Sequence, residues 1–234
     1  MSANHCAAIS ISLLAPSVVT WVGSMRYYSK LKQQGLANLS PEGRTPLNII
    51  ESILEYTQIS PFKLKVMPGK GLKACFRYSL NTVELTSDLL ESASLTSVTI
   101  AAHECGHVWQ HNQGYRLGLA NLWMTFWGIS IQISLFFVLG FISKVEFSSS
   151  VLSRIVAYFV IVLIVAGIPL SIYNCWIEYD ASRKALLLMK QLELVEKKKL
   201  GQARAILRGS LMDYITGTIC CWLISITLLA EAFC

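Results

Sequence analysis

The chain of 234 residues is predicted to be a mainly α-helical membrane protein that spans the bilayer several times and has a small α+β region outside it. Three observations predict this class. Hydrophobic residues make up 53% of the chain and the mean hydropathy is +0.50, which is too apolar for an ordinary soluble domain. The apolar residues are concentrated in blocks of about 20 residues, long enough to cross a membrane. Lys and Arg lie almost entirely between these blocks.

Four apolar blocks are candidates for membrane spans. Residues 119–142, 155–176 and 214–230 contain no charged residue, and each is long enough to cross a bilayer. A weaker block at 7–23 has no Lys or Arg before it, so it lacks the basic start of a signal peptide and is predicted to be an uncleaved anchor. The alternative for the three longer blocks is a very apolar soluble core.

The distribution of positive charge predicts the orientation of these spans. Ten of the 20 Lys and Arg residues lie between residues 24 and 116, and eight more lie between 183 and 208. Because cytoplasmic loops are enriched in Lys and Arg, both regions are predicted to be cytoplasmic in a multi-pass protein of the cell membrane. The predicted parts are an anchor at 1–23, a cytoplasmic α+β region at 24–116, two spans at 117–176, a cytoplasmic helix at 177–210 and a last span at 211–234.

Net charge and cysteine content restrict the remaining possibilities. The net charge of +6 is explained by the orientation signal, so the lipid bilayer is an expected partner and nucleic acid is not. Seven cysteines form an odd set without a C-x-x-C pair, which argues against a disulfide framework and fits a reducing cytoplasmic face.

The region before residue 95 has the pattern of a helix followed by short strands. Thr45 and Pro46 are typical of a helix start, with Thr as the cap and Pro in the first turn. Alternating apolar residues predict strands at 62–66, 75–78 and 82–85, separated by turn residues. We therefore expect a short antiparallel sheet before the next helix.

The stretch His103-Glu104-Cys105-Gly106-His107 has the spacing of a catalytic zinc site. Histidines at i and i+4 lie one turn apart on the same face of a helix, where two imidazoles can bind one metal ion. A glutamate beside the first histidine is placed to take a proton from water at that metal. A chance match is expected in about one chain in a hundred, so a helix and a third ligand are needed as support.

A helix across this motif is well supported by the flanking residues. Ser94, Thr96 and Ser97 are candidate N-caps, and Gly114 is a candidate C-cap, which predicts a helix of about 95–113. Gly106 inside it lowers helix stability by about 1 kcal/mol relative to Ala. A small residue there leaves room for a neighbouring backbone or a substrate. The sequence thus predicts a zincin-like helix.

Two candidates for the third ligand follow from the residues alone. The metzincin spacing requires Gly at 110 and His at 113, and Gln110 and Gln113 exclude it. His111 continues the i, i+4 series, but it is rotated around the helix and lies two turns from His103. The other candidate is the acidic segment that begins with Glu178 and Asp180, directly after the block 155–176.

Two blocks of this sequence resemble a known family. HECGHVWQHNQGY at 103–115, followed by apolar spans and then EYDASRKAL at 178–186, resembles the bacterial putative neutral zinc metallopeptidases, which are small multi-span membrane proteins. Their blocks read H-E-x-G-H-x-x-Q-H-x-x-G-Y and E-[FY]-D-A-S-R-[RK]-A-L. The chain is more distantly similar to the heat-shock and prenyl-protein membrane proteases, whose E-[FY]-x-A-D-R-x-A segment supplies the third ligand. The resemblance implies a gluzincin-type site with Glu178 as that ligand.

The chain departs from these families at two places. The Asp of the more distant families is replaced by Ser182, and Asp180 is the candidate to take over its role. The family pattern L-x-D-H-Y-D-P aligns with residues 72–78, which read LKACFRY here. The acidic and histidine groups of that pattern are absent, so a role of theirs in substrate binding or regulation would be changed in this chain.

These features predict a zinc-dependent membrane endopeptidase with one Zn²⁺ and a protein or peptide substrate. His103, His107 and Glu178 are the predicted metal ligands, and Glu104 is the predicted general base. Asp180 is the candidate for orienting a histidine, and the candidates for stabilising the oxyanion are Tyr179, Arg183 and His111.

The sequence leaves three alternatives to this function. The first is a proteolytically inactive scaffold that binds zinc for stability. The second is an intramembrane protease, which is disfavoured because residues 110–113 are too polar for lipid and no later Asp-Gly motif lies in a span. The third is a transporter, which is disfavoured because the spans lack ionisable residues.

Overall fold

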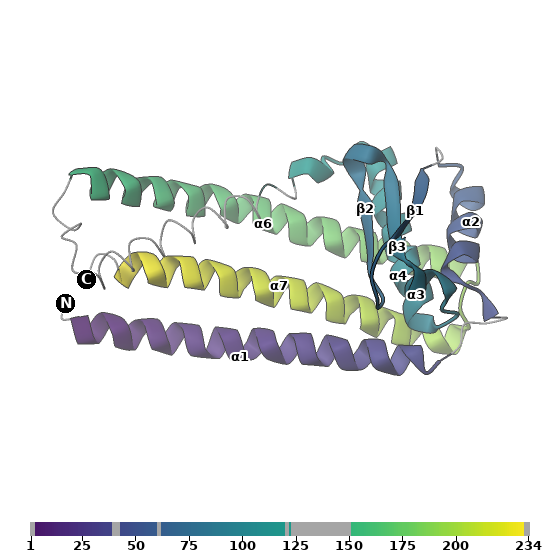
Figure 1. Ribbon diagram of the computed structural model, residues 1–234, viewed down its shortest axis with the longest axis horizontal. Coiled ribbons are helices and arrows are strands. Elements are labelled where there is room, and N and C mark those ends of the chain that lie inside the picture. The colour runs from purple at the N-terminus through teal and green to yellow at the C-terminus, as the bar shows by residue number, and fades with distance from the viewer. Residues whose placement is uncertain (1–2, 39–42, 60–61, 120–121, 123–150, 232–234) are drawn as a thin grey trace. The chain divides into compact units, whose positions relative to one another are not determined.

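The computed structural model describes residues 3–38, 43–59, 62–119, 122 and 151–231, and these residues are mainly helical (Figure 1). Contacts divide the chain into two units. The first consists of Met1–Met25, Leu119–Cys175 and Asp213–Cys234, and the second consists of Arg26–Gly118 and Trp176–Met212. The long helices α1 (Ala3–Leu36), α6 (Val151–Gln191) and α7 (Leu200–Glu231) each contribute residues to both units.

The second unit contains a three-stranded sheet in the order β1-β3-β2. The strands are β1 (Lys63–Met67), β2 (Ala74–Arg77) and β3 (Thr82–Thr86), close to the predicted ranges. The predicted antiparallel arrangement is correct for β2 and β3 and wrong for β1 and β3, which pair in parallel. The alternation of apolar residues identifies strands, but it does not determine that β3 inserts between β1 and β2.

Helices cover this sheet and build the core of the second unit. Figure 1 shows α2 (Pro46–Thr57), α3 (Ser87–Glu91) and α4 (Leu95–Asn112) grouped with the strands, and α4 packs against both α2 and β2. Every residue of the central strand β3 is buried. The largest fully buried apolar side chains of this unit are Ile49, Ile53, Leu85, Leu89, Leu95, Ile177, Leu188, Met189, Leu194 and Ile206.

The predicted helix starts agree with the structure. Thr45 lies before α2, where its backbone N–H donates to the Asn48 side chain at 3.0 Å and Pro46 occupies the first turn. Ser94 is the N-cap of α4, and its hydroxyl accepts from the Ser97 N–H at 3.2 Å. Gly114 follows α4 with a φ of +80°, a conformation that favours glycine, so its role in ending the helix is confirmed.

The predicted cytoplasmic helix at 177–210 is interrupted by a reversal of the chain. Helix α6 ends at Gln191, a short 3₁₀ turn η3 covers Lys197–Lys199, and α7 begins at Leu200. Glu193 has a φ of 48°, in the left-handed region, which breaks the helical hydrogen-bond ladder at this point. The region is therefore the end of one long helix and the start of the next.

Two helices of the described chain are long and apolar enough to cross a membrane, Ile161–Gln191 and Lys197–Thr227. They overlap the predicted spans at 155–176 and 214–230. The predicted anchor at 1–23 belongs to α1, which is not one of these two, and the predicted span at 119–142 lies almost wholly outside the described residues.

Within the first unit, α6 and α7 pack closely and α6 retains an exposed apolar surface. Gly167 leaves room for the Trp222 ring, since a Cβ there would lie 2.2 Å from it, and the Trp222 indole N–H donates to Ser171 at 3.0 Å. Val165 and Ile172 are 61% and 66% exposed. Apolar side chains that are exposed to this extent suit contact with lipid.

Candidate metal centre

The two motif histidines lie on the same face of α4, as their spacing predicts. The rings of His103 and His107 are 4.7 Å apart between centroids and nearly perpendicular at 85°. Both side chains are mostly buried, with 14% and 13% of their surface exposed. The helix that carries them is capped and packed on two sides, so the spacing of the rings is fixed by local structure.

Gly106 allows α6 to approach this part of α4. A Cβ at residue 106 would lie 2.5 Å from the backbone oxygen of Ala181 and 3.1 Å from its carbonyl carbon and Cα. Only glycine permits this contact, because the opposing atoms are backbone and cannot move aside like the end of a side chain. The prediction that Gly106 makes room for a neighbouring backbone is confirmed, and the contact places residues 178–182 of α6 beside the histidines.

Glu178 faces both histidines from α6. Its carboxylate oxygens lie 3.3 Å from His103 Nε2 and 3.6 Å from His107 Nε2. The ligand atoms of all three residues lie within 4.8 Å of one another. The structure therefore brings together the three predicted metal ligands, although Glu178 is 71 residues further along the chain than His107.

The donor set fits a zinc ion. Zn–N and Zn–O bonds of about 2.0–2.2 Å place neighbouring ligand atoms of a tetrahedral site about 3.4 Å apart. The distances of 3.3 and 3.6 Å from Nε2 to the carboxylate are close to that value. Two imidazoles and one carboxylate are also a ligand set of known catalytic zinc sites.

A hydrogen-bond chain behind His107 determines which of its nitrogens is free. The Gln110 amide nitrogen donates to the Ile177 carbonyl at 2.8 Å and to Asp180 at 3.1 Å. Both partners only accept, so the amide oxygen must face His107 Nδ1, 3.0 Å away. His107 Nδ1 therefore carries the hydrogen and donates it, which leaves Nε2 free for a metal in the neutral ring.

Asp180 belongs to the same network, one residue further from the metal centre. It accepts from Gln110 and from Lys184, and Lys184 also lies 3.3 Å from the Tyr115 hydroxyl. Asp180 thus reaches His107 through Gln110, whose part in this network was not predicted from the sequence. Its position three residues after His107, on nearly the same helix face, was the signal available for it.

The Nδ1 atom of His103 faces a hydroxyl group, as Nδ1 of His107 faces the Gln110 amide. Ser182 Oγ lies 3.3 Å from His103 Nδ1. Ser182 is four residues after Glu178, so both side chains project from α6 toward the same helix. The hydroxyl can donate or accept, so this contact orients the ring without fixing its tautomer.

Glu104, the predicted general base, is buried beside the three candidate ligands. It is 7% exposed, and the backbone N–H of Phe76 in β2 favours its ionised form. Burial raises the pKa of Glu104 above its ordinary value, and the nearby His107 and His103 lower it only in part. A raised pKa brings a carboxylate nearer to the range of an efficient base at neutral pH.

The metal-free centre attracts a cation. Burial lowers the pKa of His107, but the Glu178 carboxylate outweighs burial and raises that pKa to about 9. A proton therefore occupies His107 at neutral pH when no metal is bound. A divalent cation satisfies the same charge requirement and displaces this proton.

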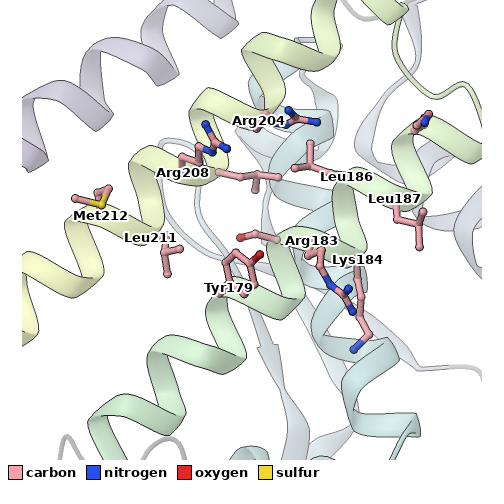
Figure 2. A pocket seen from close by; sticks show the side chains of 12 residues that line it. Tyr179, Arg183, Lys184, Leu186, Leu187, Arg204, Arg208, Leu211 and Met212 are labelled. Atoms are coloured by element: carbon pink, nitrogen blue, oxygen red, sulfur yellow. The ribbon is translucent and has the colours of Figure 1, made fainter.

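The three predicted oxyanion-stabilising candidates occupy different surroundings. The half-buried His111 packs edge-on against the Phe76 ring with centroids 5.6 Å apart, outside the group of three candidate ligands. Tyr179 and Arg183 are largely exposed and line a pocket between α6 and α7 (Figure 2). Their predicted role stays a prediction.

Two histidines one turn apart on α4 and a glutamate from α6 form a His₂Glu group that could hold a metal ion, and its donor set is one of those found in catalytic zinc sites. The chain belongs to the family described as putative neutral zinc metallopeptidase, whose model matches residues 9–231, so the resemblance of residues 103–115 and 178–186 to that family is confirmed. No curated protein and no solved structure is similar enough to this chain to be matched.

Proposed function

We propose that the protein is a zinc-dependent endopeptidase of a membrane, with the active site on the cytoplasmic side. One observation carries the proposal: two histidine Nε2 atoms converge on the Glu178 carboxylate, and a buried glutamate lies beside them. The family of the chain supports hydrolytic zinc chemistry. The two long apolar helices and the concentration of Lys and Arg in residues 24–116 and 183–208 support the membrane location and its orientation.

His103, His107 and Glu178 would hold one zinc ion and leave a position for water or substrate. Zinc in such a site supplies Lewis-acid polarisation of a peptide carbonyl and acidifies water. Gln110 holds His107 in the tautomer that presents Nε2, and Ser182 supports the His103 ring. Both contacts keep the ligands oriented before the substrate arrives.

Glu104 is the group that moves the proton in this proposal. It accepts a proton from the attacking water and delivers that proton to the leaving amine. Its burial excludes bulk water, and its raised pKa makes it a stronger base for the first transfer than an ordinary carboxylate would be. The Phe76 backbone N–H favours the ionised form that accepts the proton.

Strand β2 is the proposed binding edge for the substrate backbone. It lies at one edge of the sheet, and β3 pairs with its other side. The Phe76 backbone N–H of this strand interacts with Glu104, which supports the placement of this edge beside the proposed general base. An extended peptide that adds to this edge would have its backbone carried past the metal centre.

The experiment compares Glu104→Gln and Glu178→Ala with a surface control, Glu51→Gln on α2. Purified protein in detergent is assayed with a fluorogenic peptide library, and its zinc content is measured. Glu104→Gln should lower cleavage by about 10²- to 10⁴-fold and keep its zinc. Glu178→Ala should lose both, and the control should keep both.

Two outcomes would contradict the proposal. Equal cleavage by wild type and Glu104→Gln would refute the peptidase mechanism and leave the zinc-binding scaffold. Unchanged zinc content in Glu178→Ala would refute the ligand assignment.

A further inference from the structure

A pocket of about 660 Å³ lies between α6 and α7 in the second unit, formed by residues 179–190 and 204–212 (Figure 2). Its volume falls within the range of about 300–1,000 Å³ that is typical of small-molecule sites. The proposed peptidase mechanism assigns no role to it.

The wall of the pocket is basic and contains no acidic residue. Five of the twelve lining residues are Lys or Arg. Lys184 is buried and bonded to Asp180, and Arg183 is only loosely paired with Asp180 at 3.4 Å. Lys190, Arg204 and Arg208 are exposed and have no ion pair within the described part of the chain. These three cations have charge available for an anionic ligand.

The rest of the wall is mostly apolar. Another five lining residues are Leu or Met, including Leu187 on α6 and Leu211 and Met212 on α7. Leu187 and Met212 are 44% and 51% exposed. A small inorganic anion would pair with the cations and leave these side chains in water. A ligand that satisfies both parts of the wall has an anionic group and an apolar chain.

The order of residues along α7 supports a lipid in one orientation. Arg204 and Arg208 lie one turn apart on the same helix face, followed by Leu211 and Met212 and, after Asp213, by the uncharged run 214–230. Cations therefore come first and apolar side chains follow toward the apolar run. Basic pockets between helices at a membrane surface bind anionic lipid headgroups by this arrangement.

We propose that this pocket binds an anionic phospholipid. The phosphate lies between Lys190, Arg204 and Arg208, and an acyl chain follows Leu187, Leu211 and Met212. A zwitterionic lipid fits less well because its headgroup adds a positive charge to a wall that already holds five. The proposal uses none of the metal ligands, so it stands or falls separately from the peptidase activity.

The test is a lipid titration of the full-length, delipidated protein in detergent, followed by native mass spectrometry. The probes are a phosphatidylglycerol, a phosphatidylcholine with the same acyl chains, and inorganic phosphate as a competitor. The variant Arg204→Gln/Arg208→Gln removes two pocket cations. The matched control Lys197→Gln/Lys198→Gln removes the same charge from exposed positions outside the pocket, just before α7.

The pocket variant should bind phosphatidylglycerol roughly 30-fold more weakly than wild type, and the control should change it less than about threefold. Phosphatidylcholine should bind weakly to all three proteins, and millimolar phosphate should not displace phosphatidylglycerol. An unchanged circular-dichroism spectrum and an unchanged thermal unfolding midpoint in both variants verify that they are folded. If the double variant does not fold, Lys190→Gln replaces it, with an expected loss of about fivefold.

Three outcomes would overturn the proposal. Equal losses in the pocket and control variants would mean that only general surface charge attracts the lipid. Equal affinity for the two lipids would mean that the groove recognises acyl chains alone. Displacement by millimolar phosphate would mean that the cations bind a free anion.

Discussion

Residues 178–190 of α6 have two contrasting polar environments. On one side, Glu178, Asp180 and Ser182 are mostly buried and contact side chains of α4, and Ser182 also borders the pocket. On the other side, Arg183 and Lys190 are exposed and face a pocket shared with α7. We call these the metal-centre side and the pocket side of α6.

The difference in burial indicates which kind of function each side of α6 can support. Buried polar groups must find partners within the protein, so the metal-centre side is held rigidly through a connected hydrogen-bond network. That rigidity suits metal ligands, whose positions must be accurate before the metal arrives. Exposed cations need no protein partner, because water solvates them until a ligand displaces it. The pocket side therefore suits a ligand supplied from outside.

The largest expected effect follows from replacing Gln110, which connects His107 to Asp180 on the metal-centre side of α6. Gln110→Leu keeps the side-chain size but cannot accept from His107 Nδ1 or donate to Asp180. The His107 tautomer is then free, and zinc affinity should fall by about 10- to 100-fold. Zinc competition with a chelator of known affinity measures this loss.

The control for this change is Gln113→Leu, at the exposed end of α4. It alters the same side-chain chemistry on the same helix and should leave zinc affinity unchanged. Phosphatidylglycerol binding should be unaffected in both variants. An equal zinc affinity for Gln110→Leu and wild type would show that the network behind His107 has no part in holding the metal.

A second prediction concerns pH. The pKa of His107 is about 9 in the metal-free protein, against an ordinary value of 6.5, so at pH 7 zinc must displace one proton. Zinc affinity should therefore rise by about tenfold per pH unit between pH 7 and 9. Because the folded-state pKa is raised, the metal-free protein should also lose stability as the pH rises from 6.5 toward 9.

Calorimetric zinc titrations in two buffers of different ionisation enthalpy measure the protons released. About one proton per zinc is expected at pH 7, and none would contradict the charge balance described for Glu178 and His107. Thermal unfolding of the metal-free and zinc-loaded protein across the same pH range checks the second part. The loaded protein should show the smaller change, since zinc replaces the proton.

On the metal-centre side, some features could be predicted from the sequence and others depend on the fold. The spacing of His103 and His107 determines their relative placement within one helix, and the caps Ser94 and Gly114 delimit that helix, so these features were predictable. Glu178 was selected by its resemblance to a family. Nothing local relates residue 178 to residue 107, because their approach depends on tertiary packing at Gly106.

Three further features could not be predicted from the sequence, because they depend on how distant segments pack. The parallel pairing of β1 and β3 depends on which strand inserts between the others, and apolar alternation carries no such information. The reversal between α6 and α7 was read as a continuous helix, because residues 191–199 contain neither Gly nor Pro. The pocket side was likewise missed, since its cations come from two helices that only the fold brings together.

The last prediction, with the smallest expected effect, tests whether both sides of α6 depend on the packing contact between Gly106 and Ala181. Gly106→Ala introduces a Cβ 2.5 Å from the Ala181 oxygen, so α4 and α6 must separate by a few tenths of an ångström or more. The strain should cost about 1–3 kcal/mol, partly offset by the better helix propensity of Ala.

The control is Gly201→Ala in α7, where a Cβ would meet nothing within 4 Å and stability should not fall. Zinc affinity should decrease in Gly106→Ala alone, and phosphatidylglycerol binding should stay within about twofold of wild type in both variants, because neither Gly106 nor Ala181 lines the pocket. A parallel loss of zinc and lipid binding in Gly106→Ala would show that the two sides are coupled through the helix.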